Sequence, residues 1–248
     1  MITRKSKDQM ALMRQAGRVV AEMHEKCTAA ARPGATTEQI DAVAREVIDR
    51  RGARSNFLNY HGFPAVICTS PNDVIVHGIP GGYRLEEGDI LSIDAGAIIE
   101  GWHADAAVTI PIGQVSEEAA RLIEVTRRSL EAAIKESVAG QHLGDVGAAV
   151  ETVAVEAGFT VVREYVGHGI GTAMHEDPPV PNYGQAGRGV RIKEGYVLAL
   201  EPMINAGGPE TETLDDGWTV VTRDGSLSAH FEHTVAITEN GPEVLTLP

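Results

Sequence analysis

The chain has 248 residues, of which 43% are apolar, and a formal net charge of −14. A chain of this length and composition has enough core material for one large globular domain, which excludes an intrinsically disordered protein. The excess of negative charge argues against direct recognition of nucleic acid or of an anionic membrane, because like charges repel. No apolar run approaches the ~20 residues that span a bilayer, and residues 1–10 lack the apolar core of a secretory signal. We therefore expect a cytoplasmic protein without a membrane anchor.

Two helices are predicted at the start of the chain. Apolar residues at helical spacing predict the first over Met10–Ala31, before Pro33-Gly34. Thr36 and Gln39 form a capping-box pattern, and a second helix follows as far as Gly52. Strand patterns then cover residues 65–68, 74–76, 90–99 and 103–110, the last two forming a predicted hairpin that turns at Glu100-Gly101.

The second half of the chain repeats this order. Ser116 caps a predicted helix, and another is expected over about Val146–Ala157. Strand patterns follow over residues 159–166, 196–200, 218–222 and 227–238, with Asp224-Gly225 as a hairpin turn. The glycines that bound the second helix correspond between the halves, Gly34 with Gly140 and Gly52 with Gly158. We interpret this as an internal duplication within one domain, 1–248, with approximate halves 1–112 and 113–248. The expected fold is α+β, with helices on one face of a curved, mainly antiparallel sheet.

Four acidic side chains interrupt apolar strand patterns: Asp94, Asp105, Glu201 and Glu232. A buried lone carboxylate is costly, and any single case could be a hydrogen-bonded residue at a strand end. Four cases on four strands favour a shared site. Asp94 and Asp105 can reach the same face across the predicted hairpin, and His168, between two glycines, can add a neutral imidazole. Such a set suits a pair of divalent first-row cations, whose charge would balance that of the four carboxylates.

At these residues the chain closely resembles the type I methionine aminopeptidases, over nearly its whole length. The matching segments are Val76-His-Gly-Ile-Pro, Gly167-His-Gly-Ile-Gly, Leu200-Glu-Pro-Met and Glu232-His-Thr. The resemblance implies the pseudosymmetric pita-bread fold of the creatinase and aminopeptidase group, and two metal ions, which could be Co, Mn, Fe(II) or Zn. It also implies that Asp105 and Glu232 bridge both ions, that Asp94 holds one, and that His168 and Glu201 hold the other.

The activity implied by the resemblance is hydrolysis of the N-terminal methionine from nascent proteins and peptides with a small second residue. A hydroxide bridging the two metals would attack the peptide carbonyl. Glu201 would carry the proton to the leaving amine, His175 would hydrogen-bond the scissile carbonyl, and His77 would lie near the second residue of the substrate.

The resemblance also implies a methionine pocket lined by Tyr60, Phe63, Cys68 and Trp218, with Phe57 at its edge and Met174 beside His175. Four residues depart from the common family pattern: Phe57 where some members have Cys, Phe63 where bacterial members commonly have Tyr, Met174 where Phe is usual, and His230 where Gln is common. These changes affect the shape of the pocket and leave the implied metal ligands intact. Asn72, Val74 and Ser228 match positions that bind a monovalent cation in some relatives.

The short interval between His168 and Glu201, and the lack of a Cys-rich zinc region before the first helix, resemble the short bacterial form, which is usually monomeric. Arg4, Lys5 and Lys7 are interpreted as a charged, solvated lead-in to the first helix, with a transient ribosome contact as the alternative. Two other functions remain open. A proline-directed peptidase shares the fold, but usually has a large extra amino-terminal domain. A non-catalytic peptide-binding module should have lost metal ligands, and here all five are present.

Overall fold

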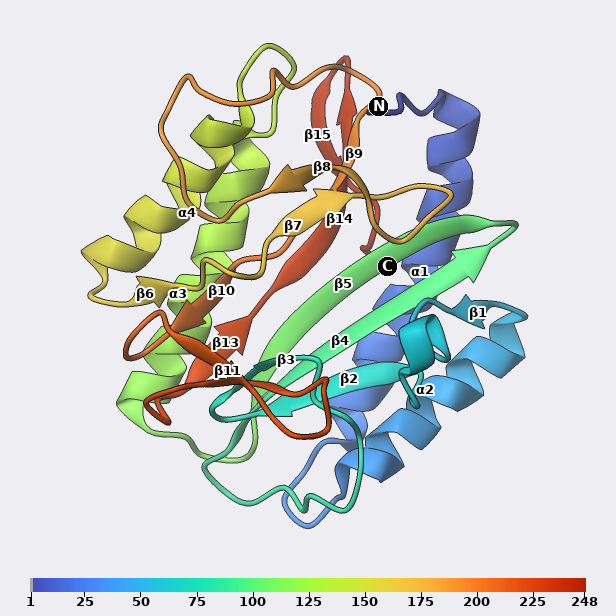
Figure 1. Ribbon diagram of the computed structural model, residues 1–248. Coiled ribbons are helices and arrows are strands. Elements are labelled where there is room, and N and C mark those ends of the chain that lie inside the picture. Colours follow the sequence, from blue (N-terminus) through green and yellow to red (C-terminus); the bar gives the residue numbers. More distant parts are fainter. Residues whose placement is uncertain (1) are drawn as a thin grey trace.

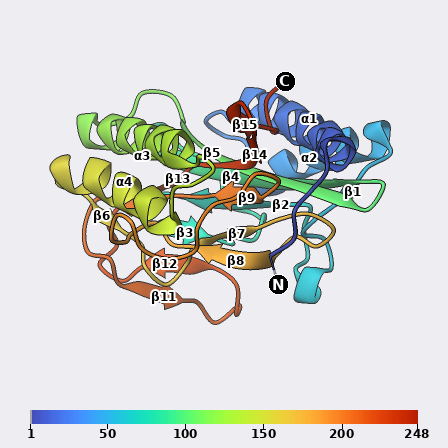
Figure 2. The ribbon, with the colours of Figure 1, turned by 90° about the horizontal axis from the view of Figure 1, so that it is seen from above.

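The computed structural model describes residues 2–248, in which four α-helices cover one face of a curved antiparallel sheet (Figure 1, Figure 2). The helices are α1 (Lys7–Ala30), α2 (Thr37–Arg51), α3 (Glu117–Glu136) and α4 (Leu143–Glu156), with one short 3-10 helix, η1 (Tyr60–Gly62). The strands are β1 (Arg54–Ser55), β2 (Ile67–Pro71), β3 (Val74–Val76), β4 (Ile90–Ile99), β5 (Trp102–Pro111), β6 (Thr160–Val161), β7 (Gly167–Gly169), β8 (Glu176–Val180), β9 (Val197–Leu200), β10 (Met203–Asn205), β11 (Thr211–Thr213), β12 (Val220–Thr222), β13 (Ser228–His230), β14 (Glu232–Thr238) and β15 (Gly241–Val244).

The main sheet joins both halves of the chain. Its strand order is β1-β4-β5-β14-β9-β7-β8, with β2 paired to β4 and β15 paired to β14. The seam between the halves is the antiparallel pairing of β5 with β14, where Glu232 lies opposite Ala107. Two small sheets, β13-β10-β6 and β11-β12-β3, flank the main one. The predicted α+β fold with a curved antiparallel sheet is confirmed.

Helices α2 and α3 begin where the capping residues predicted, whereas α1 begins at Lys7, three residues earlier than expected, because Ser6 and Gln9 form a capping box. Thr36 and Gln39 form the capping box of α2, and the Ser116 side chain accepts a hydrogen bond from the first turn of α3. Helix α4 begins earlier than expected, because the Asp145 carboxylate accepts a hydrogen bond from the backbone N–H of His142. The helices bury apolar faces against the side of the sheet seen uppermost in Figure 2, which leaves the opposite side for the polar residues described below.

Three sequence predictions were wrong in detail. The single strand expected over residues 227–238 is broken at Phe231, whose N–H donates to Pro202 O, so that β13 pairs with β10 while β14 pairs with β9. The strand expected over residues 159–166 forms only as β6. Asp224-Gly225 makes a turn but no hairpin, because the Asp224 carboxylate accepts the N–H groups of Gly208 and Ser226 and β12 pairs with β11 and β3 instead.

None of the helices within residues 2–248 has the length and apolar character needed to cross a membrane.

The carboxyl-terminal segment crosses α1 at Gly17, so we expect Gly17→Ala to destabilise the fold. A Cβ atom at this position would lie 2.0 Å from the backbone oxygen of Leu245. Glycine to alanine in a helix normally adds about 1 kcal/mol of stability, whereas here overpacking should lower the free energy of unfolding by about 1–3 kcal/mol. Urea denaturation measures the change. The exposed neighbour provides the control, since Arg18→Ala should leave the free energy within about 0.5 kcal/mol of wild type; a stabilising Gly17→Ala would contradict the close approach.

Candidate metal centre and substrate pocket

Five strands that are neighbours in the main sheet bring the predicted metal ligands to one cavity. Asp94 lies on β4, Asp105 on β5, Glu232 at the start of β14, His168 in the middle of β7, and Glu201 directly after β9. All five line a cavity of about 130 Å³. The hairpin register explains the first pair: Asp105 lies opposite Gly96, two residues from Asp94, so both side chains project from the same face.

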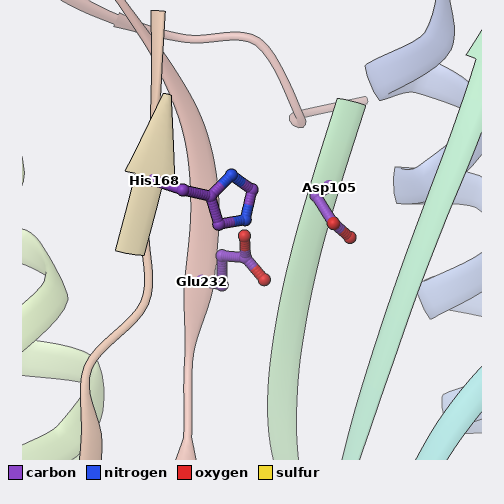
Figure 3. A group of neighbouring side chains, drawn as sticks. All are labelled: Asp105, His168 and Glu232. Carbon is purple, nitrogen blue, oxygen red and sulfur yellow. The ribbon is translucent and has the colours of Figure 1, made fainter. Parts of the chain in front are cut away.

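Three of the predicted ligands have donor atoms close enough together to share one cation. Figure 3 shows Asp105, His168 and Glu232 as neighbours on β5, β7 and β14, with the Glu232 carboxylate beside the imidazole of His168. One ligand atom from each lies within 4.8 Å of the other two, the proximity that a shared cation requires. Glu201 adjoins them, because its Oε1 lies 3.5 Å from His168 Nε2.

The carboxylates are placed where they repel one another. Burial raises the pKa of Asp94 to about 7. Burial, followed by the charges of Glu232 and Asp94, raises the pKa of Asp105 well above its usual value. The pKa values of Glu201 and Glu232 are raised in the same way, by burial first and then by neighbouring carboxylates. Such a cluster is stable in its ionised form only with positive charge between its members.

Three of the carboxylate oxygens also lack other partners. Asp94 Oδ1, Asp105 Oδ1 and Glu232 Oε1 are buried without a hydrogen bond. His168 directs Nδ1 to the Gly169 carbonyl at 2.9 Å, which leaves Nε2 as the ligand atom. Burial, and then the charge of His175, lowers the pKa of His168 to about 4, so its imidazole is neutral at physiological pH. Unpartnered carboxylate oxygens beside a neutral imidazole fit hard or borderline divalent cations.

The other side of the cavity is aromatic and apolar. Its lining comprises Phe57, Tyr60, Phe63, Cys68, His77, Met174, His175 and Trp218. The ring of Phe63 meets Trp218 edge to face at 5.1 Å and Phe57 at 6.4 Å. Burial raises the pKa of the Cys68 thiol well above its usual value, so it is neutral and behaves as a small apolar group. The cavity therefore combines a narrow apolar wall with a cluster of charged ligands.

Two histidines lie between the apolar wall and the carboxylates. His175 Nδ1 is 2.8 Å from the Tyr60 hydroxyl, and its ring centre is 4.3 Å from that of His168. His77 has a positive φ of 60° and packs edge to face against Trp218 and Tyr165. The structure thus brings every predicted metal and pocket residue to one cavity, while their individual roles stay predictions.

The residues predicted for a monovalent cation lie outside this cavity. Asn72 and Ser228 are adjacent, because the Ser228 N–H donates to the Asn72 carbonyl at 2.9 Å, and Val74 begins the neighbouring strand β3. The Asn72 side chain is already bonded to Asp89 and to the backbone of Ile90. A cation at these residues stays a prediction.

Two features of the site escaped the sequence analysis. His230 was noted only as a departure from the family pattern, yet its buried Nε2 lies 3.9 Å from Glu201 Oε2. Lys5 was interpreted as a solvated lead-in residue, which is wrong: it is only 7% exposed and pairs with Glu176, beside His175. A lysine within a charged run carries no local signal of its partner, which lies 171 residues away.

Comparisons with known proteins agree with the metal-ligand chemistry of this cavity. Residues 11–239 match the family described as metallopeptidase family M24. A protein named methionine aminopeptidase from Clostridium perfringens is 48% identical over 247 residues, covering 100% of this chain and 99% of its own length. The crystal structure of methionine aminopeptidase from Thermotoga maritima superposes with a TM-score of 0.99 at 41% identity, with both chains fully covered. A prolidase from Pyrococcus furiosus shares only the fold, at 21% identity and a TM-score of 0.81, and this chain covers 65% of it.

These findings define the chain as a metal-dependent peptidase, a hydrolase, with the pita-bread fold. The chain belongs to metallopeptidase family M24 and, within it, to the methionine aminopeptidases.

Removing the metal should destabilise the protein, and more so at higher pH. The four carboxylates have raised pKa values in the folded, metal-free protein, so their stabilising contribution is complete below pH ~4, where the unfolded chain also binds the protons. That contribution is lost as pH rises through their folded pKa values, about 7 for Asp94. The melting temperature of chelated protein should therefore be lower at pH 7.5 than at pH 5.5, and adding Mn or Co at pH 7.5 should raise it by several degrees.

Asp105→Asn is the informative variant for this prediction. It removes one buried charge, so the metal-free protein should melt higher at pH 7.5 while its response to metal largely disappears. Glu212→Gln, an exposed change of equal charge, should leave both quantities unchanged. Equal melting temperatures with and without metal would count against a shared metal site.

Proposed function

We propose that this protein removes the N-terminal methionine from nascent proteins and peptides whose second residue is small. The observation that carries the proposal is the single cavity in which an apolar, aromatic wall adjoins the buried carboxylates and His168. An unbranched, polarisable thioether side chain fits such a wall, and the adjacent ligands then face the first peptide bond. The relatives named methionine aminopeptidase, matched over their full length, support it.

The cofactor in this proposal is a pair of divalent ions, with Co, Mn, Fe(II) and Zn as the candidates. Asp105 and Glu232 would contact both ions, Asp94 would hold one, and His168 with Glu201 would hold the other. When bound, these ions would polarise the scissile carbonyl and supply a bridging hydroxide near neutral pH. Membership of family M24 and the unpartnered oxygens of the cluster support divalent metal use.

The protein's own residues would then orient the substrate and move the proton. Burial, followed by the charge of His61, lowers the pKa of His175, so its ring is neutral. If Nδ1 accepts from the Tyr60 hydroxyl, Nε2 carries the hydrogen and can donate to the carbonyl oxygen as it gains negative charge. Glu201 would accept the proton of the attacking water and pass it to the leaving amine. His77, against Trp218, would limit the size of the second residue.

The wider setting is part of the same proposal. We assign residues 1–248 to one catalytic domain, since the pairing of β5 with β14 makes the two halves share one sheet. We propose that this domain acts as a monomer in the cytoplasm. A transient ribosome contact would fall to Arg4 and Lys7, which are exposed, because Lys5 is buried.

The proposal is tested by release of free methionine from chelated protein resupplied separately with Mn, Fe(II), Co or Zn. We expect metal-dependent cleavage of Met-Ala-Ser and none of Met-Lys-Ser or Gly-Pro-Ala. Asp105→Ala should abolish the cleavage, because its side chain lies at the centre of the ligand cluster. Cleavage of Gly-Pro-Ala would instead indicate a proline-directed peptidase. Tight binding of two metals without cleavage of any peptide would favour a peptide-binding module.

His175→Ala should lower kcat for Met-Ala-Ser by about 10²–10³-fold while KM changes little, because the hydrogen bond it removes forms fully only in the transition state. Steady-state kinetics measures both constants. His142→Ala, a partly exposed histidine at the start of α4 and outside the cavity, is the matched control. An increase in KM alone would mean that His175 binds substrate without stabilising the transition state.

A further inference from the structure

The segment that precedes α1 reaches the loop that carries His175. Lys5 extends its ammonium group to Glu176 Oε2 at 2.7 Å and to Thr3 Oγ1 at 2.7 Å, and Thr3 Oγ1 donates to the same carboxylate oxygen at 2.8 Å. The Lys5 side chain is 4% exposed and that of Glu176 is 14% exposed. Lysine is seldom buried unless it is paired, so this contact is a specific feature of the fold.

The second oxygen of the Glu176 carboxylate holds the loop itself. Glu176 Oε1 accepts the backbone N–H of Thr172 at 2.8 Å and that of Ala173 at 3.3 Å. Burial alone would raise the pKa of Glu176, but the hydrogen bonds from Lys5 and Thr3 outweigh it and hold the pKa below its usual value. One charged carboxylate therefore joins the amino-terminal segment to the loop of residues 171–176.

Both ends of this connection are anchored to the main sheet. The Lys5 N–H donates to Gly195 O at 2.7 Å, just before β9, and the Gly171 carbonyl accepts the N–H of His103 on β5 at 2.9 Å. The space between them is filled, since a Cβ atom on Gly171 would lie 2.6 Å from both Glu176 Oε1 and Lys5 Cε. The ion pair thus lies between fixed points rather than on a free chain end.

His175 is held at its neighbours on either side. Met174 is buried in the apolar wall, and Glu176 begins β8, where its backbone pairs with Gly169 of β7 and its side chain forms the ion pair. The imidazole has one hydrogen-bond partner among residues 2–248, the Tyr60 hydroxyl. Without the ion pair, His175 would keep its Tyr60 contact and the backbone pairing of Glu176, but the amides of Thr172 and Ala173 would lose the fixed position of their carboxylate partner.

We propose that Lys5 and Glu176 are positioning residues, which hold the loop of residues 171–176 so that His175 faces the substrate. The inference rests on the proposed function, because that function gives His175 its contact with the peptide. Without the ammonium group, the carboxylate would be buried and unpaired, which favours its movement to water together with the Thr172 and Ala173 amides. A displacement of His175 by about 1 Å is enough to lower turnover strongly.

The test compares Lys5→Met with Lys7→Met in the full-length protein. Lys7 is the matched control, because it forms an ion pair of equal length with Glu239 but lies in solvent, with side chains 83% and 57% exposed. Hydrogen exchange of the peptide covering residues 171–176 should be faster in Lys5→Met, at the amides that Glu176 now protects, and unchanged in Lys7→Met. With Met-Ala-Ser as substrate, kcat should be at least tenfold lower in Lys5→Met than in wild type, while KM stays within about twofold. Lys5→Arg should retain most of the wild-type kcat.

A double-mutant cycle separates positioning from a general loss of stability. If Lys5 acts through His175, Lys5→Met should lower kcat no further in the His175→Ala background. Additive losses, or unchanged exchange in residues 171–176, would overturn the inference. The exchange measurement needs no activity, so a wild-type protein that releases no methionine would refute the proposed function while the anchoring by Lys5 is still tested.

Discussion

The mutual repulsion of four carboxylates buried in one cavity is the constraint on which this structure depends. The sheet opposes it with backbone pairing: Asp94, Asp105, His168 and Glu232 lie on paired strands, and Glu201 directly follows β9, which is paired with both β14 and β7. Asp105 is held most firmly, because its N–H donates to Thr234 Oγ1 at 2.9 Å and its carbonyl accepts from the same hydroxyl at 2.8 Å. Helices cover the opposite face of the sheet (Figure 2), which keeps the ligand strands from relaxing outward. Rigid strands can hold like charges together until cations neutralise them, whereas mobile loops could not.

The parts of the fold and site that the sequence predicted are those with a local signal. Capping residues marked the starts of α2 and α3, and the register of a hairpin of two ten-residue strands placed Asp94 and Asp105 on one face. Acidic residues within apolar strand patterns predicted the carboxylate cluster without any comparison. The pocket residues had no such signal, because Phe57, Phe63 and Trp218 come from irregular segments with no periodicity; only the family resemblance indicated them. The internal duplication stays a prediction. The glycines that suggested it do share a backbone conformation, because Gly34 and Gly140 both have positive φ, as do Gly52 and Gly158.

The features that sequence reasoning missed depend on contacts between distant segments. Strand β7 is three residues long and contains two glycines, so nothing in its composition indicates a strand; its pairing with β8 and β9 creates it. The break between β13 and β14 arises because residues 228–230 pair with β10, whereas residues from 233 onward pair with β9. Lys5 is the same case for electrostatics. Arg4, Lys5 and Lys7 together suggest a solvated segment. Only the fold brings Glu176 into contact with Lys5.

These contrasts separate two kinds of constraint within one cavity. The predicted metal ligands lie on or directly beside strands of a single sheet, where register fixes each position, and a change at any of them would alter the balance of charge in the cluster. The substrate wall comes largely from loops and short elements, where a change alters shape without disturbing the ligand cluster. Phe57, Phe63 and Met174, the departures from the common family pattern within the cavity, all belong to the wall. His230 lies beside Glu201, at the boundary between the two sets. The position of the carboxylate cluster therefore depends on the sheet, and that of the apolar wall depends on the loops, one of which the Lys5–Glu176 ion pair joins to the segment before α1.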